Sequence, residues 1–137
     1  MKVLLDTNIL IDVVANRKPW VEDALVLFEL ANQKKITLVA ADYSLINIAY
    51  ITRKLFQQDE LYALLADLRE YVDVVEMGEH VIDGAIRLQW KDMEDCTQYL
   101  AAKREKVDFI ITRNEKDFIL SQIPVLSPSK FLEKYLQ

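Results

Sequence analysis

The chain has 137 residues, of which 52% are hydrophobic and 28% charged, and its net charge is −5. This length predicts a single domain over residues 1–137, and two glycines and three prolines are too few for a linker or a low-complexity tail. No apolar run reaches the roughly 20 residues of a membrane-spanning helix, so an integral membrane protein is excluded and a cytoplasmic location is expected.

Predicted strands and helices alternate along the chain. Short apolar runs predict five strands, at residues 3–5, 36–40, 72–76, 108–112 and 124–126. Amphipathic spacing and start signals predict helices at residues 20–32, 43–56 with Asp42 as cap, 58–70, 79–89, 93–105 and 127–136. Since the strands are apolar throughout, both of their faces should be buried. The pattern predicts a three-layer α/β fold in which helices flank a mostly parallel central sheet of four or five strands.

The first strand, residues 3–5, runs directly into Asp6, Thr7 and Asn8. Asp and Asn are common where a strand ends and a helix begins, so a turn or a helix cap would explain them. The alternative is that Asp6 lies at the carboxyl end of a central parallel strand, where open α/β sheets place their ligand-binding groups. This segment alone leaves both interpretations open.

A second acidic group begins the helix predicted at residues 93–105. Asp92 and Asp95 are three residues apart, so they share one helix face, whereas Glu94 is expected to point elsewhere. Acids in a first helical turn also favour the helix dipole, and Asp92 could be only an N-cap. Taken alone, the pair indicates a capped helix more often than a site.

The strand at residues 108–112 also ends in polar side chains, those of Thr112, Asn114 and Asp117. If this strand and the first strand are parallel neighbours, Asp6 and Asp117 can converge at one edge of the sheet with the acids of the helix. Clustered carboxylates repel one another unless a cation intervenes, so the cluster predicts a divalent ion. Because the chain has one cysteine and one histidine, oxygen ligands and therefore Mg²⁺ or Mn²⁺ are expected.

The helix predicted at residues 43–56 is apolar almost all the way round, which predicts burial on several sides, either in the core or in a subunit contact. Asn47 shares a face with Ser44, Tyr50 and Lys54. A buried amide must be hydrogen-bonded, so Asn47 is expected to have a partner, either structural or functional. We expect a homodimer, with this helix as a candidate interface through Leu45, Ile48 and Ile51.

Three motifs in this order resemble the PIN-domain family of ribonucleases, which includes VapC-type toxins of prokaryotic toxin–antitoxin pairs. They are "LLDTNILID" at the start, "DMEDCTQYLAA" in the last third and "FIITRNEKDF" near the end. The resemblance covers nearly the whole chain. It implies a PIN-like fold, a Mg²⁺- or Mn²⁺-dependent endoribonuclease acting on single-stranded RNA or tRNA, and an antitoxin protein as partner.

Residue by residue, the resemblance implies roles for the acids and for the polar residues near them. The catalytic acids are Asp6, Asp95 and Asp117, and the metal ligands are these three with Asp92. The supporting polar residues are Asn8, Asn47, Thr112 and Asn114. Candidate phosphate contacts, each of which could equally be a solvated surface charge, are Arg53, Lys54, Arg113 and Lys116.

One position departs from the family pattern, because Asn47 stands where a glutamate is common. An amide carries no charge and cannot act as a base, so either Asp92 supplies the missing charge or metal binding is weaker. The alternative function is therefore a catalytically weak or inactive module that binds RNA or a partner protein. Phosphotransfer at Asp6, as in aspartate-nucleophile phosphatases, is disfavoured because Asn8 occupies the position of their second aspartate.

Overall fold

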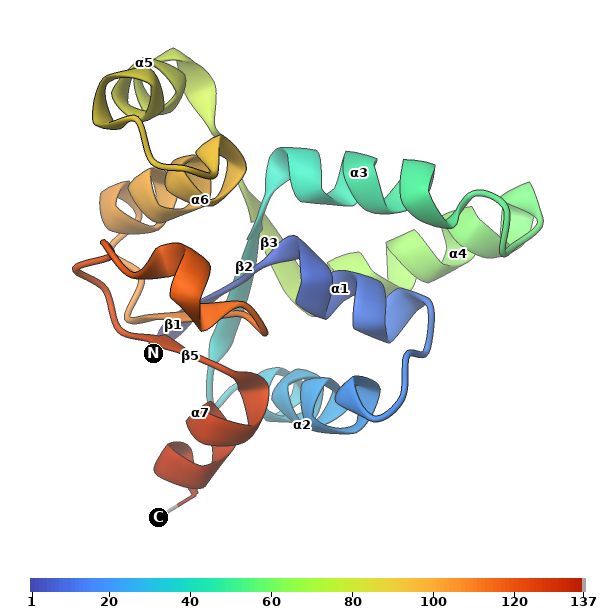
Figure 1. Cartoon of the computed structure of the whole chain (residues 1–137). Coiled ribbons are helices and arrows are strands. Elements are labelled where there is room, and N and C mark those ends of the chain that lie inside the picture. The colour runs from blue at the N-terminus through green and yellow to red at the C-terminus, as the bar shows by residue number, and fades with distance from the viewer. Residues whose placement is uncertain (137) are drawn as a thin grey trace.

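The structure, a computed structural model, describes residues 1–136 and contains a five-stranded sheet (Figure 1). Every pair of neighbouring strands is parallel, and their order is β3-β2-β1-β4-β5. The strands are β1 (Lys2–Leu5), β2 (Thr37–Ala41), β3 (Val72–Val75), β4 (Phe109–Ile111) and β5 (Val125–Leu126). Each lies within one residue of its predicted bounds, which confirms the parallel α/β prediction.

Seven α-helices and one short 3-10 helix surround this sheet in the described part of the chain. They are α1 (Thr7–Val14), α2 (Trp20–Asn32), α3 (Asp42–Thr52), α4 (Gln58–Arg69), α5 (Gly78–Leu88), α6 (Met93–Arg104), η1 (Glu115–Phe118) and α7 (Pro128–Tyr135). Between Met1 and Leu136, no helix has the length and apolar character needed to cross a membrane.

The helices form two layers, one on each face of the sheet. Side chains of β1 alternate between them, since Val3 and Leu5 join the core with α1, α2 and α4, whereas Leu4 joins the core with α5 and α6. Figure 1 shows α5 and α6 on one side of the sheet and α1, α2 and α4 on the other. Burial of one leucine side chain contributes about 2 kcal/mol, so strands that are apolar on both faces stabilise this three-layer arrangement.

The order of the strands places two chain segments side by side at one sheet edge. From β1 the chain proceeds outward through β2 and β3, then returns to the other side of β1 to form β4. The backbone N–H of Asp6 donates to the carbonyl of Ile111, 3.0 Å away, so the carboxyl ends of β1 and β4 are adjacent. This switch in strand order is where open α/β sheets bind ligands.

Helix α3 differs from the prediction in its bounds and in its environment. It ends at Thr52 rather than residue 56, because the chain must turn before α4, which begins with a capping box between Gln57 and Glu60. Asp42 is the first helical residue instead of the cap.

Within one chain, α3 is buried along one side and exposed along another, so burial on several sides would require the predicted subunit contact. Ile48 is fully buried in the chain's own core, whereas Ile46, Tyr50 and Ile51 are exposed. The helix packs on α1, α4 and β2, and Tyr43 near its start also contacts α6. Because Ile48 is fully buried within the chain, it is unavailable as a dimer contact.

A buried ion pair ties α1 to the segment after β4. The guanidinium of Arg113 donates twice to the fully buried carboxylate of Asp12, through Nε at 2.7 Å and Nη2 at 3.1 Å. The same guanidinium lies over the ring of Trp20, 4.1 Å from the centroid. Arg113, predicted as a phosphate contact, thus has a structural partner at its charged end.

We expect Arg113→Ala to lower the free energy of unfolding by about 3 kcal/mol, because it leaves the Asp12 carboxylate buried without its cation. Urea denaturation measures this, with Arg53→Ala as the control, since Arg53 is an exposed arginine that also stacks on an aromatic ring, that of Tyr50. Equal losses in the two variants would show that the ion pair does not stabilise the fold.

Candidate active site

The carboxylate of Asp6 lies at the sheet edge between β1 and β4 and accepts three hydrogen bonds. Its Oδ1 accepts from the backbone N–H of Thr7 at 2.7 Å and from Nε2 of Gln98 at 2.8 Å. Its Oδ2 accepts from the hydroxyl of Thr112 at 2.7 Å. Asp6 is also the N-cap of α1, so this one residue both follows a central strand and caps a helix. Three donors from different elements fix the orientation of this side chain.

Two amide oxygens beside Asp6 are buried without a hydrogen-bond partner among residues 1–136. One is Oε1 of Gln98, whose nitrogen is occupied by Asp6. The other is Oδ1 of Asn8, whose Nδ2 lies 3.4 Å from the Thr112 hydroxyl. Orphaned buried acceptors are costly, so both would be stabilised by a proton donor or a cation.

Sequence reasoning missed Gln98. The available signal was its spacing, because it lies three residues after Asp95 on α6 and therefore on the same helix face. The side chain of Gln98 is fully buried, and a buried polar side chain needs a hydrogen-bond partner.

The carboxyl of Asp95 is affected by four other acids. Asp95 is buried, and its pKa is raised to about 8, first by burial and then by the negative charges of Asp6, Asp92, Asp117 and Glu94. These residues come from the position after β1, the start of α6 and η1, which are far apart in sequence. The acids are therefore near enough to act on Asp95, and their role as metal ligands stays a prediction.

Glu94 belongs to this cluster, and the prediction that it points elsewhere is wrong. The hydroxyl of Thr7 lies 3.4 Å from its Oε1, and burial and the charges of Asp6 and Asp92 raise its pKa. The same hydroxyl is 2.7 Å from that of Ser44. The first turn of α6 lies against the starts of α1 and α3, which bring these hydroxyl groups to Glu94.

Asp92 is the N-cap of α6, with its Oδ1 accepting the backbone N–H of Asp95 at 3.1 Å. The capping interpretation of Asp92 is thus confirmed. Since its charge also raises the pKa of Asp95, the cap remains part of the acidic cluster.

Asn47 does not take part in this network. It is half-buried, and its side chain has no hydrogen bond within the described residues, so the expected partner is missing. Two earlier residues of α3 contact the site instead: Ser44 through the Thr7 hydroxyl, and Tyr43, whose hydroxyl donates to the backbone carbonyl of Glu94 at 3.0 Å.

The cationic candidates differ in position. Lys116 adjoins Asp117 on η1. Arg53 and Lys54 follow the far end of α3, roughly 13 Å along the helix axis from Ser44 at about 1.5 Å per residue.

The donors around Asp6 suit a hard divalent cation in chemistry and charge. Carboxylate and amide oxygens are the ligands that Mg²⁺ and Mn²⁺ prefer, and a cation would relieve the repulsion that raises the pKa of Asp95. Within residues 1–136, no three acidic, histidine or cysteine side chains are close enough to hold an ion without moving. The donors therefore suit a metal by their chemistry, whereas their spacing in this structure does not assemble a complete ligand set.

Comparison with known proteins gives the family. The sequence profile of the PIN domain matches residues 2–116. The chain belongs to the PIN domain family. It is 26% identical to Ribonuclease VapC1 of Aquifex aeolicus (strain VF5) over 142 residues, which cover 98% of this chain and 95% of that protein.

Solved structures share the PIN domain fold with this chain. A chain of VapBC2 from Rickettsia felis, solved with a DNA fragment from its promoter, superposes with a TM-score of 0.69 at 18% identity and covers 93% of this chain and 98% of that one. A toxin–antitoxin complex from Klebsiella pneumoniae gives a TM-score of 0.63 at 22% identity, covering 92% and 97%.

Asp95→Asn should stabilise the protein at alkaline pH in EDTA. Because folding raises the pKa of this carboxyl from 3.8 to about 8, its contribution to stability is present below about pH 4 and is lost as the pH rises through about 8. We expect the variant to gain about 1–3 kcal/mol of unfolding free energy at pH 8.5 and little at pH 4.

Urea denaturation at the two pH values measures this gain. Asp83→Asn, on the exposed face of α5, is the matched control and should not change the pH dependence. A gain for Asp95→Asn that is the same at both pH values would contradict the raised pKa of Asp95.

Proposed function

We propose that this PIN domain is a metal-dependent endoribonuclease that hydrolyses phosphodiester bonds in single-stranded RNA or tRNA, as the toxin of a toxin–antitoxin pair. The observation that carries the proposal is the group of carboxylates near Asp6 and Asp95, where burial first and the negative charges of the neighbouring acids second raise the pKa of Asp95. Similarity to Ribonuclease VapC1 supports the same class of reaction.

The proposed metal ligands are the acids that converge at this edge, Asp6, Asp92, Asp95 and Asp117. When bound, Mg²⁺ or Mn²⁺ supplies Lewis-acid activation of the phosphodiester and of water. Thr112 and Gln98 hold the Asp6 carboxylate in one orientation, and the backbone N–H of Asn114 donates to the Thr112 hydroxyl at 3.0 Å. Asn8 supports the same hydroxyl.

Asp95 has a second role in this proposal. With its pKa near 8, the carboxyl holds a proton at neutral pH until a positive charge enters the cluster. Lys116, which adjoins Asp117, is the proposed contact for the RNA phosphate next to the site. Arg53 and Lys54 would meet only RNA that extends along α3.

A non-catalytic module that binds RNA or a partner protein is the second candidate. The uncharged Asn47 and the separation of the acids favour it. The ribonuclease should bind Mn²⁺ and need it for cleavage, whereas the non-catalytic module should do neither.

Purified protein with Mn²⁺ should cleave labelled single-stranded RNA, and EDTA should stop the reaction. Asp6→Asn should reduce the rate by about 100-fold or more, equivalent to about 3 kcal/mol of transition-state stabilisation, whereas Asp83→Asn should retain it. Cleavage that survives both EDTA and Asp6→Asn would exclude the metal–carboxylate mechanism. No cleavage, together with no Mn²⁺ binding by calorimetry, would favour the non-catalytic module.

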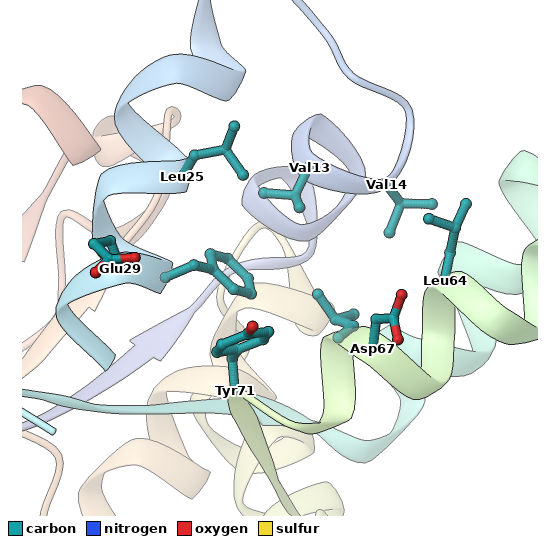
Figure 2. A pocket seen from close by; sticks show the side chains of 9 residues that line it. Val13, Val14, Leu25, Glu29, Leu64, Asp67 and Tyr71 are labelled. Atoms are coloured by element: carbon teal, nitrogen blue, oxygen red, sulfur yellow. The ribbon is translucent and has the colours of Figure 1, made fainter. Parts of the chain in front are cut away.

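The proposed antitoxin site is a groove between α1, α2 and α4, away from the acidic cluster. This α1–α2–α4 groove has a volume of about 390 Å³ and is shown in Figure 2. Apolar side chains line it, including Val13, Leu25 and Leu64, while Glu29 and Asp67 lie at its edge. An apolar surface with acidic edges suits an amphipathic helix that carries basic residues.

The proposed homodimer would use the exposed face of α3. Ile46 and Tyr50 are 71% and 65% exposed, and such large apolar side chains favour a protein contact. In this proposal, Ile46 and Tyr50 form the dimer contact that the sequence had assigned in part to Ile48, which is buried.

Two matched variants test the α1–α2–α4 groove and the exposed face of α3 independently. In each test, the chain is coexpressed with the antitoxin of its own operon. Leu25→Glu, which places charge in the groove, should prevent copurification of the antitoxin and leave the chain dimeric. Ile46→Glu should give a monomer by light scattering and retain the antitoxin. Copurification unaffected by Leu25→Glu would place the antitoxin elsewhere, and a monomeric unmodified chain would exclude the homodimer.

A further inference from the structure

A pocket adjoins the acidic cluster, and the proposed mechanism gives no role to its aromatic and aliphatic walls. It lies between the loop that precedes α6 and the segment around η1, and its volume is about 360 Å³. Two acids of the cluster, Asp92 and Asp117, form part of its wall. The remaining lining residues are Trp90, Lys91, Lys116, Ile119 and Leu120, and we call this the Trp90 pocket.

The Trp90 pocket has a rigid aromatic wall. Trp90 stacks on Tyr99 with ring centroids 5.0 Å apart and an angle of 21°, and it meets Phe118 edge-on at 6.4 Å. Tyr99 and Phe118 are both buried, so they hold the indole from the protein side while it remains part of the pocket wall. Fixed aromatic side chains of this kind stack on unpaired nucleobases.

Two large aliphatic side chains lie at the mouth of the pocket in contact with solvent. Ile119 is 83% exposed and Leu120 is 65% exposed, although they are consecutive and border a candidate active site. Contiguous exposed apolar side chains beside a polar site mark a binding surface. A planar base between these side chains and the indole would cover them.

The charges of the Trp90 pocket narrow the choice of ligand. Asp92 and Asp117 disfavour an anion inside the pocket, so a free phosphate group is a poor occupant. Lys91 and Lys116 disfavour a basic peptide. A nucleotide satisfies both conditions, because its base is uncharged and aromatic while its phosphate can remain outside, next to the lysines.

We propose that the Trp90 pocket binds one nucleobase of the RNA, next to the phosphodiester at the acidic cluster, and so selects the cleavage position. The identity of the ligand as RNA rests on the proposed function. Trp90 and the aliphatic pair hold the base, and Lys91 and Lys116 contact the flanking phosphates.

The two tryptophans of the chain provide a direct test by nuclear magnetic resonance. In EDTA, the indole N–H signal of Trp90 should shift saturably with nucleoside 5′-monophosphates and not with ribose 5-phosphate, which lacks a base. Trp20 stacks under Arg113, outside the pocket, so its signal is an internal control and Trp20→Phe assigns it. The double variant Ile119→Ser and Leu120→Ser should weaken binding at least threefold. Leu55→Ser should not weaken binding, because Leu55, which is as exposed as Leu120, lies beyond the far end of α3.

The possible results separate this proposal from the catalytic one. Equal shifts with ribose 5-phosphate, no saturable shift, or a larger shift with a hexalysine peptide would overturn the nucleobase pocket even if RNA is cleaved. A base-dependent shift without any RNA cleavage would support the pocket and contradict the proposed reaction.

Discussion

The structure depends on the placement of the Asp6 carboxylate, which is buried and must be hydrogen-bonded. Its three donors come from α1, from α6 through Gln98, and from the end of β4 through Thr112. An unpaired buried charge costs several kcal/mol, so these elements must meet at one point for the chain to fold. The same requirement assembles the acidic cluster, because Asp92 and Asp95 are on α6 and Asp117 follows β4.

The buried acids Asp12 and Asp95 have opposite electrostatic surroundings. Asp12 is neutralised by a bidentate arginine, which makes it part of the framework that joins α1 to the segment after β4. Asp95 has other carboxylates near it, and its pKa is raised first by burial and then by their charges. Charge repulsion that the fold leaves uncompensated is typical of sites that bind cations or perform proton transfer, and it lowers stability where it occurs.

The sequence predicted the strands better than it predicted the surroundings of the acids that follow them. Asp6, Asp95 and Asp117 follow apolar strands or begin a helix, and such patterns are visible in one dimension. Glu94 was misplaced because helical spacing describes one helix and not the helices that pack against it. Gln98 and the Asp12–Arg113 pair join residues about 90 to 100 positions apart, so no local pattern indicates them. For the same reason, the composition of α3 did not show which of its faces meets the core.

The sequence by itself determined the alternation of strands and helices, the parallel sheet and the presence of acids at strand ends, because these follow from local hydrophobicity and spacing. Only the tertiary structure decided which side chains surround Asp6, which cation is already paired, and where open pockets lie. Hydrogen bonds, burial and the repulsion between charges depend on distances in space, and those distances arise only when β1 and β4 become neighbours and α6 packs across their ends.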